Sequence, residues 1–192
     1  MKKIKKIVAI IPARGGSTRL KKKNIYPVLG KPMIQYTIDA CKKSSYDIEI
    51  WVSTDCQKIK KIALELNTNI HNRSKINANS ESYKQAAIRE AADFIIKKKN
   101  IVPDIILSLQ ANSPTITNKE IDKCINALLT YDRDEIVSVD KNLMQDAAIR
   151  VFRSNYVFQK DLSTNFGVVI TDLFDVHTIE DVKHVESLLL KK

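Results

Sequence analysis

The 192-residue chain has few glycine, cysteine and aromatic residues: four glycines, three cysteines and 6% aromatics. The cysteines, Cys41, Cys56 and Cys124, are far apart and form no CxxC pair. Their odd number argues against a disulfide framework and favours a reducing, cytoplasmic location. With so few aromatic rings, we expect a core made mainly of Ile, Leu, Val and Ala.

Long apolar runs, repeats and internal linkers are also missing. No stretch approaches the roughly 20 apolar residues that cross a membrane, so we expect no membrane partner. The start, MKKIKKIVAIIPA, has the charged and apolar parts of a signal peptide, but its apolar run is short and no separate cleavage site follows. We therefore expect a single domain over residues 1–192, long enough to bury a substantial core.

Charge is abundant and mainly positive. The chain has 32 Lys and Arg against 22 Asp and Glu, a formal net charge of +10. Such a balance fits nucleic acid, an acidic membrane surface, an anionic small substrate or simply a solvated lysine coat. Because the aromatics are few and show no cluster typical of RNA-binding strands, we expect no nucleic-acid partner.

The apolar pattern alternates between strands and helices. Continuous apolar runs predict strands, and apolar residues at helical spacing predict helices between them. Strands are expected at 6–12, 48–54, 103–110, 135–140, 155–158 and 166–171, with a further strand end at 175–177. Helices are expected at 32–43, 57–66, 80–98, 117–129 and 178–192. This order favours an α/β fold with a mainly parallel central sheet.

Three of these helices begin with the spacing of a capping box. The pairs are Ser82 with Gln85, Thr117 with Glu120, and Thr178 with Asp181. Since ligands on parallel sheets bind beyond the carboxyl ends of the strands, we expect the site there. Four segments lie at such ends: 13–24, 53–55, 110–114 and 175–177.

The segment after the first strand has the composition of a phosphate-binding loop. Glycines let backbone N–H groups surround phosphate oxygens, hydroxyls add donors, and cations neutralise charge. The loop matches neither the P-loop nor the G-x-G-x-x-G pattern. Its candidate residues are Arg14, Gly15, Gly16, Ser17, Thr18, Arg19, Lys21, Lys22 and Lys23.

Four segments together resemble the acylneuraminate cytidylyltransferase family, the CMP-sialic acid synthetases. IPARGGSTRLKKKNIYPVLGKPMIQYTIDA is similar to the opening of that family, and VSTD to its second strand and turn. SLQANSP and DVHTIED are similar to its LQPTSP and DIDTPED segments, in the same order. The resemblance implies a three-layer α/β/α nucleotidyltransferase, Rossmann-like fold.

The implied reaction is transfer of CMP from CTP to an acidic sugar, a sialic or other nonulosonic acid, with release of pyrophosphate, for surface-glycan synthesis. The implied cofactor is Mg²⁺, with Mn²⁺ as an alternative. A keto-deoxy-octulosonate cytidylyltransferase, another non-sialic acid enzyme and a non-catalytic CTP-binding homologue stay open as alternatives.

The resemblance also assigns roles to individual residues. For the nucleotide these are Ala13, Arg14, Gly15, Gly16, Ser17, Lys23, Asn24 and Arg73; for the acceptor Gln110 and Ser113; for the metal Asp175 and His177; and for catalysis Arg14, Lys23 and Asp175. If 175–177 is a strand end, Asp175 and His177 point to the same side and address one metal.

Other interpretations of these positions remain. Gln110 also fits the end of a strand, and Arg73 a solvated loop. Asp175 and His177 also fit a surface pair before a helix.

The chain departs from the family pattern at several points. Thr18 replaces a common lysine, with Arg19 next to it, and His177 replaces a second metal aspartate, although Mg²⁺ prefers oxygen ligands. The segment 141–166 is shorter than the part that builds acceptor contacts and much of the dimer interface in the family. We expect an altered acceptor contact there, with a homodimer as one outcome, and Arg150, Arg153 and Lys160 as candidates to meet an acidic acceptor.

Overall fold

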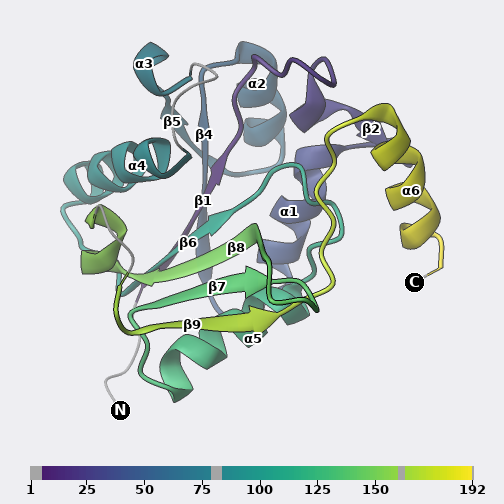
Figure 1. Ribbon diagram of the computed structural model, residues 1–192. Coiled ribbons are helices and arrows are strands. Elements are labelled where there is room, and N and C mark those ends of the chain that lie inside the picture. Colours follow the sequence, from purple (N-terminus) through teal and green to yellow (C-terminus); the bar gives the residue numbers. More distant parts are fainter. Residues whose placement is uncertain (1–5, 79–83, 160–162, 192) are drawn as a thin grey trace.

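The centre of the protein is a mixed sheet in the order β5-β4-β1-β6-β8-β7-β9 (Figure 1). The structure is a computed structural model that describes residues 6–78, 84–159 and 163–191. The strands are β1 (Ile7–Pro12), β4 (Ile48–Thr54), β5 (Asn69–Asn72), β6 (Ile105–Leu109), β7 (Glu135–Val139), β8 (Gln145–Arg153) and β9 (Phe166–Ile170). Only β8 runs antiparallel to its neighbours in this sheet, so the predicted mainly parallel sheet is confirmed.

Helices cover both faces of the sheet and complete three layers. One apolar cluster joins the sheet to three helices, and a second joins its other face to a fourth helix and a 3₁₀ turn. The first three are α1 (Met33–Lys42), α2 (Gln57–Glu65) and α5 (Asn118–Thr130); on the other face are α4 (Lys84–Lys99) and η2 (Ser154–Phe158). The expected α/β/α class is therefore confirmed.

Strand β1 shows why its sequence is apolar without interruption. Ile7, Ala9 and Ile11 face α1, α2 and α5, while Val8 and Ile10 face α4. All five are buried, as the continuous run predicts for a parallel strand that is covered on both faces. The strand ends at Pro12, and the loop that follows leaves the sheet at its carboxyl edge.

A third apolar cluster holds the C-terminal helix beside this edge. Helix α6 (Ile179–Leu189) packs with Val182 and Val185 against Leu20 and Val28, close to the small hairpin of β2 (Pro27–Val28) and β3 (Lys31–Pro32). Figure 1 shows α6 lying beside β2 and away from the sheet. The cluster therefore ties the end of the loop after β1 to the C-terminal segment.

Two of the three predicted capping boxes lie within the described residues, and both are confirmed. At α5, the Thr117 N–H donates to the Glu120 carboxylate at 3.1 Å, and both halves of the capping box are present. At α6, the Asp181 N–H donates to the Thr178 hydroxyl at 3.2 Å. The pair expected at α4 includes Ser82, which lies outside the described residues.

Several predictions of local structure are wrong. Residues 155–158 were expected to form a strand but lie in the 3₁₀ turn η2, where Val157 packs under α4. Asp175 and His177 lie in an irregular segment, so the alternation of a strand does not place them on one side. Pro32 precedes α1 instead of opening it. Strands β5 and β8 and the short helix α3 (Lys75–Ala78) were not predicted.

Across the described residues, no helix is long and apolar enough to cross a membrane.

Candidate active site

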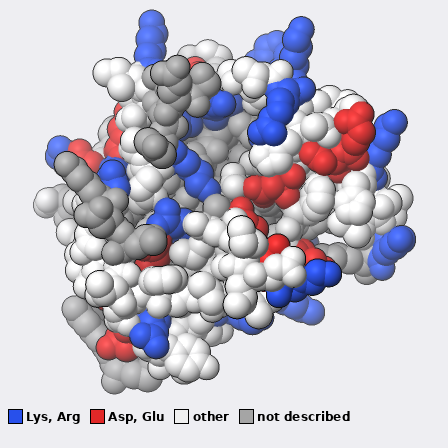
Figure 2. Space-filling view, in the orientation of Figure 1, with Lys and Arg blue, Asp and Glu red and all other residues white. Residues whose placement is uncertain are grey.

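The main candidate site is a cavity of about 230 Å³ beyond the carboxyl ends of β1 and β6. Its lining comes from segments that are far apart in the sequence. The lining residues are Pro12, Arg14, Ser17, Thr18, Arg19, Leu20, Lys23, Asn24, Arg73, Lys84, Gln110, Asn112 and His177. Figure 2 shows Lys and Arg side chains gathered around the recess on this face.

Seven of the twelve residues predicted for the site line this cavity, and five do not. The seven are Arg14, Ser17, Lys23, Asn24, Arg73, Gln110 and His177. Asp175 lies directly behind Gln110, which donates to it. Ala13 and Ser113 are fully buried, and Gly15 and Gly16 belong to the loop that forms the cavity edge. The structure thus assembles most of the predicted set in one place.

The loop after β1 is attached to the turn after β4. The Ala13 N–H donates to the Ser53 carbonyl at 2.9 Å, and the Gly15 N–H donates to the Asp55 carboxylate at 2.9 Å. A Cβ on Gly15 would lie 2.9 Å from the Cβ of Cys56, which is closer than such atoms approach. Gly15 is therefore required because two backbones meet closely here.

This attachment changes the expected mode of phosphate binding. The N–H of Gly15 is taken by Asp55, and the Ser17 N–H donates to the Gly15 carbonyl at 3.1 Å. The Gly15 N–H is therefore not available to a phosphate. The side chains of Arg14, Ser17 and Lys23 line the cavity and are the donors nearest to this loop.

Asn24 holds the two ends of the loop after β1 together. It is buried in η1 (Lys23–Ile25), and its Nδ2 donates to the Arg14 carbonyl at 3.0 Å. The bond orders the backbone that presents Arg14. Asn24 also lines the cavity, so a ribose contact and a structural role are compatible.

Two cations of the cavity are held in surroundings that disfavour charge. Burial lowers the pKa of Lys23, and Arg19 and Arg14 add to the effect, while Asp175 opposes it. Burial also lowers the pKa of Arg73, opposed by Asp55 and reinforced by Arg14. Cations gathered in a partly desolvated cavity are stabilised when an anion binds between them.

Arg73 also has a buried donor that no described residue satisfies. Its backbone N–H donates to the Thr54 carbonyl at 3.0 Å, which anchors the residue just after β5. Its side-chain Nε is buried without a hydrogen-bond partner in the described part of the chain. Because an unpaired buried donor is costly, this atom indicates a place for a ligand oxygen or nitrogen.

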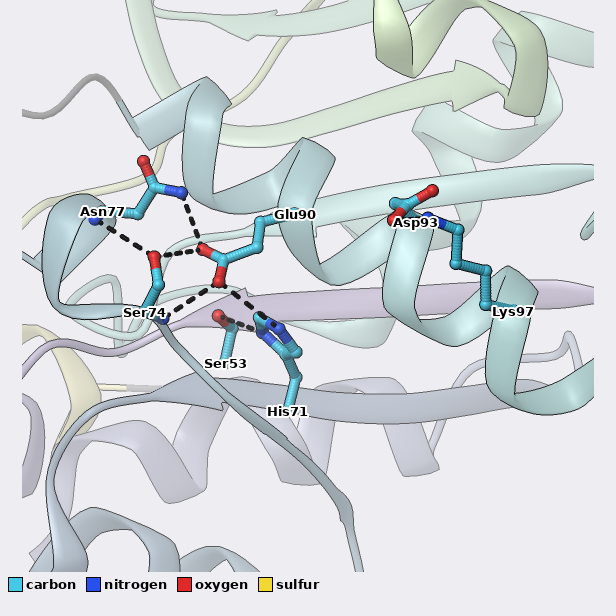
Figure 3. A network of polar contacts seen from close by, with 7 residues as sticks. All are labelled: Ser53, His71, Ser74, Asn77, Glu90, Asp93 and Lys97. Atoms are coloured by element: carbon cyan, nitrogen blue, oxygen red, sulfur yellow. Dashed lines mark hydrogen bonds and ion pairs between the residues drawn. The ribbon is translucent and has the colours of Figure 1, made fainter.

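A buried Ser–His–Glu network lies next to Arg73 (Figure 3). The Ser53 hydroxyl and His71 Nδ1 are 3.0 Å apart, and His71 Nε2 is 3.9 Å from Glu90. The Glu90 carboxylate accepts from the Ser74 N–H at 3.0 Å and from Asn77 Nδ2 at 2.7 Å. The residues come from β4, β5, the loop after β5, α3 and α4.

This network resembles a hydrolytic triad only in its residue types. The exposed fraction of Ser53 is 0%, so no substrate reaches its hydroxyl. Burial lowers the pKa of His71, which keeps the ring neutral against the attraction of Glu90. The network fixes Ser74, and with it the segment that carries Arg73, against α4.

The opposite wall of the cavity is built around Asp175. The Gln110 Nε2 donates to its carboxylate at 2.6 Å, and the Ser113 hydroxyl donates to its other oxygen. Burial raises the pKa of Asp175 to about 7, with Asp146 adding to the effect and Lys84 and Lys23 opposing it. Ser113 is thus a support of Asp175 and does not line the cavity.

The backbones on this wall are held by pairing between loops. The Val176 N–H donates to the Asn112 carbonyl at 2.8 Å, and Asn112 Nδ2 donates back to the Val176 carbonyl at 3.0 Å. The Gln110 carbonyl accepts from the Thr37 hydroxyl at 2.8 Å, and its N–H donates to the Ala148 carbonyl at 3.0 Å. Tertiary bonds, not a strand, therefore set the position of Asp175.

His177 turns toward the loop after β1. Arg19 Nη2 donates to its Nδ1 at 3.2 Å, and the His177 N–H donates to Asp181 at 2.8 Å. Burial lowers the pKa of His177, and Lys23 and Arg19 lower it further. Arg19, next to Thr18, thus lies in the cavity, where the family pattern has a lysine one position earlier.

The donor set at this wall fits a cation only together with a substrate. No group of three or more His, Cys, Asp and Glu side chains that could hold a metal occurs among the described residues. Mg²⁺ is commonly held by one or two carboxylates plus substrate phosphates. Asp175 supplies one carboxylate at this wall, and its two oxygens accept from Gln110 and Ser113. His177 Nδ1 is engaged with Arg19, and an imidazole nitrogen is a poor ligand for Mg²⁺.

Lys84 is a site residue that sequence reasoning missed. It is the first residue of α4, it is partly buried, and it lines the cavity beside Gln110. Burial lowers the pKa of Lys84 to about 8, Asp175 and Asp146 oppose this, and Arg150 adds to it. One lysine in a lysine-rich helix gives no signal in the sequence, because only the packing of α4 turns it to the cavity.

The cation-lined cavity lies at the carboxyl ends of a mainly parallel sheet, where open α/β proteins bind their ligands. The chain matches the cytidylyltransferase family over residues 8–165, and it belongs to that family.

Two curated relatives show how far the similarity extends. N-acylneuraminate cytidylyltransferase A of Danio rerio is 32% identical over 138 residues, which cover 72% of this chain and 31% of the relative. Pseudaminic acid cytidylyltransferase of Campylobacter jejuni is 34% identical over 116 residues, which cover 60% of this chain and 50% of the relative. The chain thus spans half or less of the length of these relatives.

Two further proteins match over more of their length. The 3-deoxy-manno-octulosonate cytidylyltransferase of Desulfosudis oleivorans is 30% identical, and the match covers 84% of this chain and 69% of the relative. The solved structure of CMP:2-keto-3-deoxy-manno-octonic acid synthetase complexed with CTP superposes with a TM-score of 0.78 at 16% identity, covering 97% of this chain and 99% of that chain. The latter likeness shows the fold.

Proposed function

We propose that the protein transfers CMP from CTP to the hydroxyl of an acidic sugar and releases pyrophosphate. The observation that carries the proposal is the set of five cationic side chains that line one cavity, Arg14, Arg19, Lys23, Arg73 and Lys84. A triphosphate is the common small ligand that needs so many cations in one place. Membership of the cytidylyltransferase family supports CTP as its source.

The reaction needs positioning and charge stabilisation more than a protein nucleophile. The acceptor hydroxyl oxygen attacks the α-phosphorus of CTP, and the bond from that phosphorus to the oxygen bridging it to the β-phosphate breaks. Pyrophosphate leaves with the bonding electrons, and the hydroxyl proton passes to water. In this proposal Arg14 and Lys23 stabilise the charge that grows on the phosphates, and Arg73 contacts the nucleoside end.

Mg²⁺, or Mn²⁺ in its place, is the proposed cofactor. Asp175 would hold it together with the substrate phosphates, and His177 is a second predicted ligand. The ion would neutralise phosphate charge and polarise the reacting oxygens.

The acceptor is proposed to be a sialic or other nonulosonic acid, or keto-deoxy-octulosonate. The named relatives act on acylneuraminate, pseudaminic acid and 3-deoxy-manno-octulosonate, all acidic sugars. These relatives support an acidic sugar as the acceptor, but they do not distinguish among the three acids. Synthesis of a surface glycan, a cytoplasmic location, the absence of nucleic-acid and membrane partners, and a homodimer stay predictions.

The segment 141–166 takes part in the central sheet. Its described residues include β8 and η2, and β8 lies inside the sheet between β6 and β7. The segment therefore contributes to the core, in addition to any acceptor or dimer contact.

The test is pyrophosphate release from CTP with Mg²⁺ or Mn²⁺ across a panel of sialic, pseudaminic and keto-deoxy-octulosonic acids. ATP, GTP and UTP are the matched nucleotide controls. We expect turnover with CTP and one acid acceptor. CTP binding without release across the panel would instead favour the non-catalytic homologue, and equal release from all four nucleotides would contradict the assignment to CTP.

A further inference from the structure

We propose that Lys84 is the cation that binds the carboxylate of the acceptor, and so determines the preference for acidic sugars. This inference rests on the proposed function and specifies one residue of it. Lys84 was given no role by the sequence patterns described above.

The chemistry of the acceptor requires a cation near the reacting end of the cavity. In sialic acids and keto-deoxy-octulosonate, the anomeric carbon carries both the reacting hydroxyl and the carboxylate. Whatever binds the carboxylate must therefore lie close to the point of attack. A buried carboxylate without a cationic or hydrogen-bonding partner would weaken binding strongly.

Lys84 is a cation in the part of the cavity where the acceptor is proposed to bind. It lines the cavity with Gln110, and it interacts electrostatically with Asp175, whose carboxylate Gln110 contacts. Arg14 and Lys23 lie on the loop after β1, whereas Lys84 reaches the cavity from α4. An acceptor between Gln110 and Lys84 would present its hydroxyl toward the phosphates held by that loop.

The first turn of α4 is hydrogen-bonded to β8 and η2. Arg150 Nη1 donates to Gln85 Oε1 at 3.1 Å, and Gln85 Nε2 donates to the Val157 carbonyl at 3.3 Å. Arg150 Nε in turn donates to the buried Glu135 at 2.9 Å. These bonds hold Gln85, the residue next to Lys84, against β8 and η2.

The other described cations proposed for the acceptor, Arg150 and Arg153, do not line the cavity. Arg150 is paired with Glu135, and its guanidinium lies 4.9 Å from the Phe152 ring centre. Arg153 pairs with Asp132 at 2.6 Å, at the end of β8 that is remote from the cavity. Lys160 lies outside the described residues. Of the described cations that line the cavity, Lys84 is the one contributed by α4.

The test compares Lys84→Met, Lys84→Arg and the wild type in the pyrophosphate assay, with the acceptor acid and its methyl ester as alternative substrates. We expect Lys84→Met to raise the KM for the acid at least tenfold, to leave the KM for CTP within about twofold, and to remove the preference for the acid over the ester. Lys84→Arg should keep much of that preference because it keeps the charge. Lys97→Met, on the exposed side of the same helix, is the control.

The outcomes separate this inference from the proposed function. Turnover by the wild type, with an unchanged acid-to-ester ratio in Lys84→Met, would overturn the role of Lys84 alone. A loss of CTP affinity as large as the loss of acceptor affinity, also in Lys84→Arg, would assign Lys84 to the structure or to CTP and overturn the inference too. No turnover by the wild type with any acid, despite CTP binding, would overturn both.

Discussion

The two walls of the cavity differ in how they balance charge. The wall formed by the loop after β1 and the end of β5 brings together Arg14, Lys23 and Arg73, with Asp55 as the nearby acid. The opposite wall pairs Asp175 with Lys84 and hydrogen-bonding amides. An excess of cations suits a triphosphate, whereas balanced charges suit an acceptor with one carboxylate. We therefore expect the triphosphate at the first wall and the acceptor at the second.

The largest expected effect comes from removing a cation of the phosphate wall. We expect Lys23→Ala to lower kcat/KM for CTP by about 10²–10³-fold, the loss that follows removal of one preorganised charge-stabilising group. The measurement is pyrophosphate release at varied CTP. Lys21→Ala, an exposed lysine of the same loop, is the control. Equal effects of the two variants would show that bulk positive charge, not the cavity, binds CTP.

The next effect should appear on the opposite wall. We expect Asp175→Asn to lower kcat by about 100-fold while CTP still binds, because the change removes the charge that would hold the metal and keeps the shape. Steady-state kinetics and CTP calorimetry measure the two effects separately. Asp172→Asn, exposed on the same segment, should behave as the wild type. A normal kcat in Asp175→Asn would remove Asp175 from the reaction.

A smaller effect should follow when the contact between the loop after β1 and β4 is opened. We expect Gly15→Ala to lower the free energy of unfolding by about 1–3 kcal/mol, because its Cβ would meet Cys56. It should weaken CTP binding as well, since the loop that presents Arg14 would shift. Gly16→Ala is the matched control, because nothing lies within 4 Å of its added Cβ. Thermal and denaturant unfolding measure this, and equal stabilities would contradict the close approach.

The smallest effect concerns the network behind Arg73. Glu90→Ala leaves the Ser74 N–H, the Ser74 hydroxyl and Asn77 Nδ2 without their acceptor, so we expect a loss of about 1–3 kcal/mol in stability. The KM for CTP should rise several-fold with little change in kcat, because Arg73 is positioned less well. Asp93→Ala, one turn along the same helix, is the control (Figure 3). An unchanged KM would limit the network to stability.

The phosphate wall could be predicted from the sequence because its residues are close together in the chain. Arg14, Ser17 and Lys23 follow a strand whose apolar run is unmistakable, and the loop falls at the carboxyl end where ligands bind. The prediction that the glycines provide N–H groups does not hold at Gly15, whose N–H donates to Asp55. That bond joins residues 40 positions apart, and no local pattern reports it.

The opposite wall could be predicted only in part. Asp175 and Gln110 were found through the resemblance, but the strand expected around Asp175 was wrong, and Lys84 was missed. Strand β8 was missed as well, although it crosses the sheet in the opposite direction between β6 and β7. Its pairing partners lie elsewhere in the chain, so its position depends on long-range hydrogen bonds.

The amino-acid sequence by itself determined the elements with strong periodicity, the α/β class and the basic loop after β1, since these depend on neighbours in the chain. The tertiary structure alone decided which distant side chains share the cavity. Lys84 faces Asp175 because α4 packs on the sheet and the Asn112–Val176 pairing holds the C-terminal segment against it. Burial and long-range packing determine which charged side chains lie together at the cavity and how their pKa values shift, and no short segment of the sequence encodes either.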